Sequence, residues 1–390
     1  MKKLILSSLF VFVVSTLFAA DSIEVRGFWM RYSKPKTIAV DTARANDIAR
    51  AEAKRVRFIY DVDFYSYFDN REYHDPYQTP QTIFNFRLAP EVGVQIRDLI
   101  GGTHRLIAGV NYTQRLGGDW NDVQFDPTAY YHYNYKGVNL RLGAIPFAQR
   151  LHALPDFLLY DSIGYFHPNI QGALFSYQDH RGYAEFMCDW RGAQETDCRE
   201  MFRIVVDGRY QYKWFNIGGF VQLNHKANPK APTPREGVCD DFYVSPQIGF
   251  DFTDLLSPID SFSVTLGYVL GIQNDRTAEI YKKPQGFTAD LYFNWWFLGV
   301  HNRFYYGDCM MPNYGKWGHF LNQGDPFYQS KIYNRLDIFA YIYRNSFVNC
   351  YLSYNLHYDG ETLQHQQQLN VRFLLSGLKS KKPLRNIFEK

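Results

Sequence analysis

The residues of this sequence best suited to chemistry are charged side chains that recur at every second position of long alternating segments. In residues 82–96, Arg87 and Glu91 fall on one parity. Leu88 and Val92 fall on the other. Because the side chains of a strand alternate between its two faces, this pattern places the charges on one polar face. We predict that the polar faces of the other segments carry Arg105, Arg115, Arg141, Arg203, Asp207, Arg209, Arg303, Arg335 and Asp337.

Such charges could select ions if their faces line a water-filled space, because rows of fixed charge favour the passage of one sign. Over all polar-face positions the arginines and the acids are equal in number, with ten of each, so no net preference for anions or cations follows. The alternative is that the charges pair across neighbouring strands and brace the wall. The sequence leaves both roles open.

Signatures of bond-making or metal chemistry are absent from the sequence. It contains no GxSxG, HExxH, GxxxxGK[ST] or CxxC motif, and its eleven histidines are scattered. His225, His301 and His357 have no second histidine or acid at a recognised metal-ligand spacing. We therefore predict a protein that is not an enzyme and that binds no cofactor or metal. A Ser/His or Asp/His set that only the fold assembles stays open as the alternative.

The elements that must position these charges are long strands. Spanning a bilayer takes about 9–11 residues per strand, with one face toward lipid and one toward the lumen. Short connections alternate with long ones between the segments, as in an antiparallel barrel. We predict an all-β, transmembrane antiparallel barrel of sixteen strands, with 14–18 as the range, beginning near residues 55, 81, 103, 123, 138, 172, 183, 202, 215, 241, 261, 286, 299, 332, 348 and 363.

Composition agrees with fine segregation of apolar and polar residues. Aromatic residues make up 18% of the chain, yet the mean hydropathy is -0.36. The formal charge is +3, and no basic run is interleaved with aromatics as a nucleic-acid groove requires, so no nucleic-acid partner is predicted. Aromatics near strand ends predict girdles at the membrane interface: Tyr65, Tyr67, Tyr130, Tyr131, Trp214, Trp295, Trp296, Tyr305 and Tyr306.

The chain divides into four parts. Residues 1–20 have the order of a secretory signal peptide, with two lysines followed by an apolar run. Residues 21–54 contain a predicted short helix and either plug the lumen or lie in the periplasm. Residues 55–373 form the barrel, and residues 374–390 are a basic tail.

The five cysteines are an odd number for an exported chain, so at least one lacks a partner within it. Cys188 and Cys198 flank one proposed outer loop, and the oxidising route outward favours a bridge. We predict a Cys188–Cys198 disulfide, with Cys350 free on an apolar face. A bridge between Cys239 and Cys309 is a less supported second pair.

In this architecture the chain resembles Gram-negative outer-membrane β-barrels of the porin-like family over roughly residues 55–373. The resemblance implies a place in the outer membrane, contact with its lipid, and a channel for diffusion of small hydrophilic solutes or ions. Association of identical subunits stays open. The runner-up is a closed structural or partner-binding barrel, and the third alternative is a barrel enzyme or adhesin.

Two long connections could modify the lumen. Residues 147–171 are the most apolar, and by resemblance to porins this loop would fold inward as a constriction. Arg150, Asp156 and Asp161 are then the constriction residues. Packing of this loop between subunits is the alternative. Residues 307–331 either bind a ligand at the surface or cap the mouth.

Overall fold

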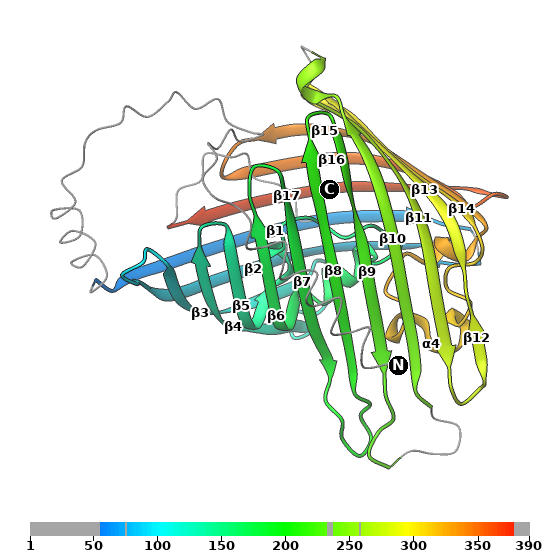
Figure 1. The fold of residues 1–390 in the computed structure, drawn as a ribbon, viewed down its shortest axis with the longest axis horizontal. Helices are drawn as coiled ribbons and strands as arrows, with labels where there is room; N and C mark the ends of the chain where they lie inside the picture. The colour runs from blue at the N-terminus through cyan, green and yellow to red at the C-terminus, as the bar shows by residue number, and fades with distance from the viewer. Residues whose placement is uncertain (1–54, 75, 232–236, 257–258, 378–390) are drawn as a thin grey trace. The chain divides into compact units, whose positions relative to one another are not determined.

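The barrel wall is one closed antiparallel sheet (Figure 1). The computed structural model describes residues 55–74, 76–231, 237–256 and 259–377. The first strand, β1 (Arg57–Glu72), pairs with both β2 (Gln81–Arg97) and β17 (Leu363–Ser376), which closes the sheet. The predicted signal peptide, the segment 21–54 and the tail from residue 378 onward lie outside the described residues.

Sixteen long strands make up this wall in the described part of the chain, and the seventeenth, β12 (Ile280–Lys282), is a short extension paired only with the end of β11. The sixteen strands and the all-β class confirm the sequence prediction. The remaining strands are β3 (Thr103–Arg115), β4 (Val123–Tyr135), β5 (Val138–Pro146), β6 (Asn169–Gln178), β7 (Gly182–Gly192), β8 (Met201–Tyr212), β9 (Phe215–Lys226), β10 (Cys239–Asp251), β11 (Ser261–Asp275), β13 (Gln285–Trp295), β14 (Leu298–Gly307), β15 (Ile332–Arg344) and β16 (Val348–Tyr358).

The alternation in the sequence becomes an inside and an outside. On β2, Val92 and Val94 are 51% and 45% exposed on the outer surface. Arg87 and Glu91 are only 6% and 8% exposed and face inward. An apolar outer face with a polar interior is the arrangement of a transmembrane barrel. In the described part of the chain, no helix is both long and apolar enough to cross a bilayer.

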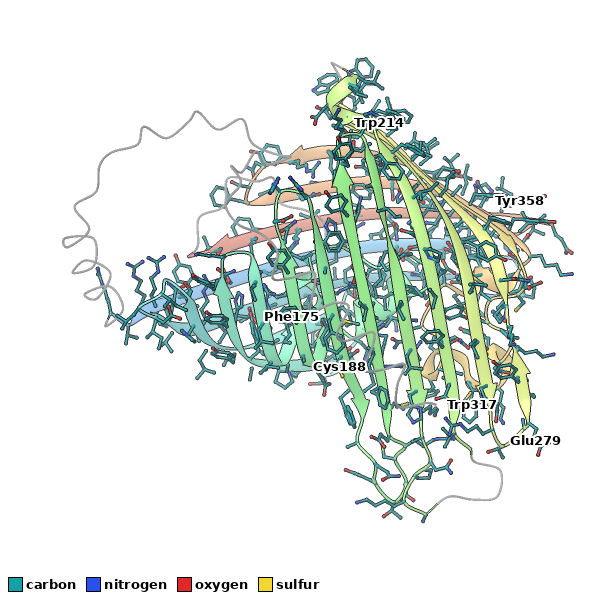
Figure 2. All side chains as sticks on the ribbon, in the orientation of Figure 1. Phe175, Cys188, Trp214, Glu279, Trp317 and Tyr358 are labelled. Atoms are coloured by element: carbon teal, nitrogen blue, oxygen red, sulfur yellow. The ribbon has the colours of Figure 1, made fainter. Side chains whose placement is uncertain are left out.

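Short connections gather at one end of the barrel, which we call the turn end. The β4–β5 hairpin turns in two residues, and both Lys136 (φ 43°) and Gly137 (φ 85°) adopt positive φ, as a tight hairpin requires. A side chain at Gly137 would place its Cβ 2.3 Å from the carbonyl oxygen of Gln178, so glycine is required there. In Figure 2, Trp214 of a short turn and Glu279 of a longer connection lie at opposite ends of the front strands.

Long connections extend from the opposite end, which we call the loop end. Two of them fold back into the barrel. The strap loop, residues 147–168, contains the turn η1 (Phe147–Gln149) and helix α3 (Asp161–Phe166). The mouth loop, residues 308–331, contains α4 (Tyr314–Trp317), η3 (Gly318–Phe320) and η4 (Pro326–Gln329). A further turn, η2 (Thr253–Leu255), lies at the turn end.

Candidate functional site

The strap loop folds inward because its apolar side chains find a buried environment only inside the wall. Leu154, Phe157, Leu158 and Ile163 are each at most 8% exposed. Leu154, Phe157 and Leu158 join one hydrophobic cluster with inward residues of β3 to β8 and with the mouth loop. Burial of such side chains contributes about 1.5–3 kcal/mol each, which favours the inward position over an exposed loop.

The start of the strap loop is fixed to β7 and β8 by charge. The Arg150 guanidinium donates through Nε to Glu185 (2.7 Å) and through Nη2 to Asp207 (2.5 Å). The backbone N–H of Leu151 donates to the second oxygen of Glu185 (2.9 Å). All three charged side chains are at most 4% exposed, so each charge depends on its partner for compensation.

The middle of the strap loop is fixed to a different part of the wall. Asp156 accepts from Arg303 of β14 (2.7 Å), and Asp161 accepts from Arg335 of β15 (3.3 Å). Asp337 binds both arginines, at 2.8 Å from Arg335 Nε. Because β9, β10, β11 and β13 separate β8 from β14 in the sheet, the two anchors show that the loop crosses the lumen.

The end of the strap loop contacts β1. Arg71 donates to Ser162 Oγ (2.8 Å) and to the hydroxyl of Tyr160, while its Nη2 pairs with Asp69 (2.6 Å). Tyr165 stacks on Tyr67 with ring centroids 4.0 Å apart. The strap loop therefore has three anchors on three parts of the wall.

The mouth loop supplies a second set of buried groups from the loop end. Trp317 Nε1 and Lys316 Nζ both donate to Asp275 of β11, at 3.0 and 2.6 Å. The backbone N–H of Asn313 donates to Gln273 (3.1 Å). Several of its apolar side chains are almost fully buried: Met310, Met311, Leu321, Phe327 and Tyr328.

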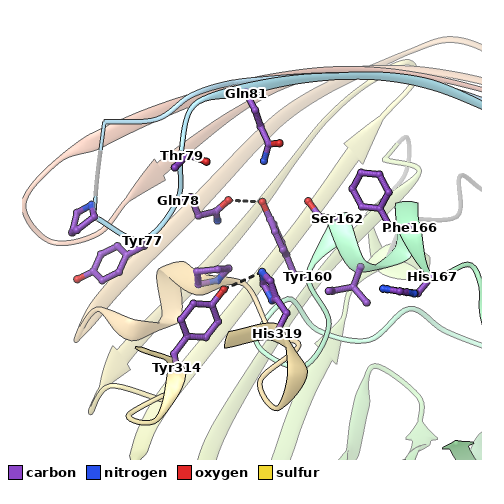
Figure 3. Close-up of a pocket in the computed structure, with 13 residues that line it drawn as sticks. Tyr77, Gln78, Thr79, Gln81, Tyr160, Ser162, Phe166, His167, Tyr314 and His319 are labelled. Atoms are coloured by element: carbon purple, nitrogen blue, oxygen red, sulfur yellow. Dashed lines mark hydrogen bonds between the residues drawn. The ribbon is translucent and has the colours of Figure 1, made fainter. Parts of the chain in front are cut away.

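The two inward loops bind each other. The Asp325 N–H donates to the carbonyl of Asp156 (2.8 Å), and the Tyr160 N–H donates to the carbonyl of Gln323 (2.7 Å). A pocket of about 430 Å³ lies where they meet the connection after β1 (Figure 3). The figure shows the Tyr160 hydroxyl bonded to Gln78 in this pocket, which is also lined by Ser162, Phe166, His167, Tyr314 and His319.

Asp325 makes the contact between the loops sensitive to pH. Burial raises the pKa of Asp325 to about 6, although Gln78 (2.7 Å) and the Phe327 N–H (3.1 Å) donate to its carboxyl group. Below about pH 4 this group is protonated in both the folded and the unfolded chain. Between about pH 4 and 6 only the unfolded chain loses the proton, so stability falls as pH rises. Above about pH 6 the penalty is constant.

We therefore expect the free energy of unfolding of the barrel to decrease by about 3 kcal/mol between pH 4 and 7 through this group. Asp325→Asn removes that contribution. Chemical unfolding of the refolded barrel at several pH values measures it, with Asp119→Asn in the exposed β3–β4 connection as the control. An unchanged pH profile in Asp325→Asn would contradict the assignment.

The polar-face residues predicted from the sequence divide into three environments. Eight are buried on the inner face: Arg87, Glu91, Arg141, Arg203, Asp207, Arg303, Arg335 and Asp337. Arg105 is half-buried toward the turn end and donates to Gln95 (2.8 Å). Arg115 and Arg209 are exposed, so the structure does not bring them to the strap loop. The strap loop gathers Asp207, Arg303, Arg335 and Asp337 with its own Arg150, Asp156 and Asp161.

Sequence reasoning missed Asp69 and Arg71 because it ended the first strand near residue 68, whereas β1 continues to Glu72. It also assigned Tyr65, Tyr67, Tyr130 and Tyr305 to the outer girdle. All four are instead buried, at most 3% exposed, and contribute to the lumen. The sequence did contain a signal for this inward position, because each tyrosine has the same parity as the inward polar residues of its strand. The predicted girdle residues Trp214, Trp295, Trp296 and Tyr306 are exposed, each by 46% or more.

The predicted Cys188–Cys198 disulfide is not formed, and all five cysteines are free. Cys188 lies within β7, paired with Ile204 and Ala173, on the parity opposite to the inward Glu185 and Asp189 (Figure 2). Cys198 lies in the exposed loop beyond the strand. The prediction was wrong because it placed Cys188 at the loop base, whereas its side chain faces outward from the wall.

A polar cluster lies on the outer surface at the loop end of β9 and β10. His225 Nδ1 donates to Asp240 (2.6 Å), and Arg276 donates to the other oxygen of Asp240 (2.8 Å). Phe202 stacks on the His225 ring at 4.9 Å. Within the described residues, no group of three or more histidine, cysteine or acidic side chains could hold a metal ion.

Comparison with known proteins gives one family and a set of similar folds. The model of the family described as lipid A 3'-O-deacylase-type matches residues 50–373. No curated protein matches the chain. A variant of OccD1 (OprD) is 11% identical, with a TM-score of 0.49, covering 84% of this chain and 98% of that one.

Two other porins give similar values. The OmpF porin of Salmonella typhi, solved with daunomycin, is 10% identical with a TM-score of 0.48, covering 83% of this chain and 99% of that one. A variant porin of Rhodopseudomonas blastica is 10% identical with a TM-score of 0.45, covering 82% and 100%. At this identity the similarity concerns the barrel fold alone.

Proposed function

The chain belongs to the lipid A 3'-O-deacylase-type family, and within it we propose that the barrel is an outer-membrane channel for small hydrophilic solutes or ions. The proposed position is the outer membrane of a Gram-negative bacterium, with lipid against the apolar outer face. The loop end then faces outward and the turn end faces the periplasm.

One observation carries this proposal: the strap loop crosses the lumen and places its acidic side chains against arginines of the barrel wall. Asp156 and Asp161 lie against Arg303 and Arg335, so fixed charges of both signs meet in one cross-section. Opposed charges in a narrow cross-section select solutes by size and by charge. Toward the turn end the inner face is more exposed, as Arg209 of β8 shows.

Single-channel conductance in planar bilayers tests the channel. We expect a small conductance for the unaltered barrel, and a shift of the reversal potential toward anion preference in Asp161→Asn, which removes a negative charge from the narrow cross-section. The control is Glu361→Gln in the exposed β16–β17 connection. Absence of conductance in both the unaltered barrel and Asp161→Asn would contradict the proposal and favour a closed barrel.

A second candidate, hydrolysis of an acyl ester of a membrane lipid such as lipid A, is supported by family membership and by the His225–Asp240 pair on the outer surface. Asp240 would hold the imidazole with Nε2 facing away, where it could accept a proton from an attacking water. The same proton would then go to the leaving alkoxide, giving a free fatty acid and an alcohol.

The inward loops offer less support for that chemistry. Ser162 accepts a hydrogen bond from Arg71, and His319 is bonded to Tyr314, so these two pocket residues are not paired as nucleophile and base. The outer pair is therefore the group to test. Leu223 and Phe242 face outward two residues from His225 and Asp240 on the same strands, closer to the middle of the wall, and both are apolar.

Mass spectrometry of lipid A incubated with the purified barrel tests this second candidate. Loss of one acyl chain is expected with the unaltered protein and not with His225→Gln. His365→Gln is a matched control, since His365 also faces outward and bonds a neighbouring side chain, the hydroxyl of Tyr354 (2.7 Å). Full acyl release by His225→Gln, or none by the unaltered protein, would rule out the outer pair.

A further inference from the structure

A group of cations surrounds one aromatic side chain at the loop end of the lumen. The Arg199 guanidinium carbon and the Lys226 ammonium lie 4.8 and 5.0 Å from the ring centroid of Trp317. Lys226 is also 4.4 Å from the ring of Phe320. Arg191 donates to the carbonyl oxygen of His319, between these two rings in the chain (3.3 Å). Three cations thus converge on the turn at residues 317–320, which carries the two aromatic rings.

Two cations of this group, Arg191 and Lys226, have no acidic side chain paired with them within the described part of the chain. Lys226 is 7% exposed and has no hydrogen bond or ion pair to a described side chain. Arg191 likewise has no carboxylate within ion-pair distance among these residues. Two nearby cations are neutralised: Lys316 by Asp275 (2.6 Å) and Arg203 by Asp189 (3.1 Å). The positive charges without a carboxylate partner are therefore those of Arg191 and Lys226.

Burial of an ammonium group without a counter-charge carries a large desolvation free energy, and repulsion from a second cation close by adds to it. Cation–π contact with Trp317 and Phe320 offsets only part of this desolvation cost. Arg199 cannot supply the missing negative charge, and it donates to the carbonyl oxygens of Ala227 (2.8 Å) and Gly237. An anion placed between Arg191 and Lys226 would complete the group.

We propose that Lys226 and Arg191, with Arg199 behind them, form an anion site that takes the phosphate group of a soluble solute. Lys226 lies on the inner face of β9, opposite the fully buried Cys239, so the site lies on the lumen side of the wall rather than against lipid. Guanidinium and ammonium donors are the usual partners of phosphate oxygens. The proposal is independent of conductance, because a closed barrel could hold the same site.

Titration of the refolded full-length barrel with inorganic phosphate at pH 7 tests the site by tryptophan fluorescence. We expect a saturable change that Trp317→Phe removes. Lys226→Gln should weaken binding about tenfold or more, as expected for loss of a charged hydrogen bond. Lys226→Arg should bind within about threefold of the unaltered protein. Lys331→Gln, an exposed lysine at the end of the mouth loop, is the control.

Phosphate affinity that is unchanged in Lys226→Gln overturns the proposal, and so does the absence of saturable binding to the unaltered barrel. A second arm uses barrels in vesicles containing a phosphorylated lipid. If that lipid alters the fluorescence and inorganic phosphate does not compete, the ligand is a headgroup and the assignment to a soluble solute is overturned. Competition by inorganic phosphate supports it. Chemical unfolding of each variant separates a loss of binding from a loss of fold.

Discussion

Arg335→Met is expected to destabilise the barrel by about 3–5 kcal/mol, the usual effect of leaving one partner of a buried ion pair without compensation. Arg335 is 4% exposed and binds Asp161 (3.3 Å), Asp337 (2.8 Å) and, more weakly, Asp156 (3.5 Å). Methionine keeps much of the volume and removes the charge. Urea unfolding of the refolded protein in detergent or bilayer measures the loss.

A matched control separates charge from site. Arg209→Met removes an arginine from the same inner face, but Arg209 is exposed and lies 5.9 Å from the ring of Tyr183, so a change below about 1 kcal/mol is expected. Adding Asp161→Asn to Arg335→Met should restore about 1–2 kcal/mol, because the two sites are coupled. An equal loss of unfolding free energy in Arg335→Met and Arg209→Met would mean that Arg335 does not hold the strap loop.

Val92→Arg is the second substitution with a large expected effect. Val92 is 51% exposed on the outer face of β2, so we expect an arginine there to lie in the hydrocarbon layer. The expected cost is about 2–4 kcal/mol, with slow or incomplete assembly into bilayers. Folding into lipid vesicles, followed by the shift in gel mobility between folded and unfolded forms, measures both.

Ile96→Arg provides the depth control for this substitution. Ile96 faces outward on the same strand but lies one residue from its end, where arginine should cost about 0–1 kcal/mol. Equal assembly of Val92→Arg and Ile96→Arg would show that the outer face of β2 does not contact the middle of the membrane.

The strands of the wall could be predicted because the alternation that defines them is a pattern of neighbouring residues in the sequence. Alternation in residues 82–96 assigns Arg87 inward and Val92 outward whichever strands become the neighbours of β2, since strand geometry alone fixes the two faces. The number of strands could be predicted for the same reason, because each strand carries its own alternating pattern. The sixteen predicted starts lie within three residues of the observed ones, because tight turns such as Lys136–Gly137 leave little freedom.

The side-chain environments at strand ends were less predictable. Tyr65 and Tyr67 have the residue type of a membrane girdle and the parity of the lumen, and the structure follows parity. Cys188 has the sequence position of a loop base, yet the strand continues past it to Gly192. In both cases a preference of residue type or spacing is weaker than the register of a long strand within a closed sheet.

The sequence by itself therefore determined a barrel of sixteen long strands with a polar interior, and it indicated that residues 147–171 avoid water. Only the tertiary structure decided that Arg150 meets Glu185 and Asp207, and that Asp156 and Asp161 meet Arg303 and Arg335 across the lumen. It also decided that the mouth loop folds inward and presents Trp317 to Lys226. The physical reason is range: alternation is set by neighbouring residues of one strand, whereas these contacts join residues 35 to 174 positions apart and depend on closure of the whole sheet.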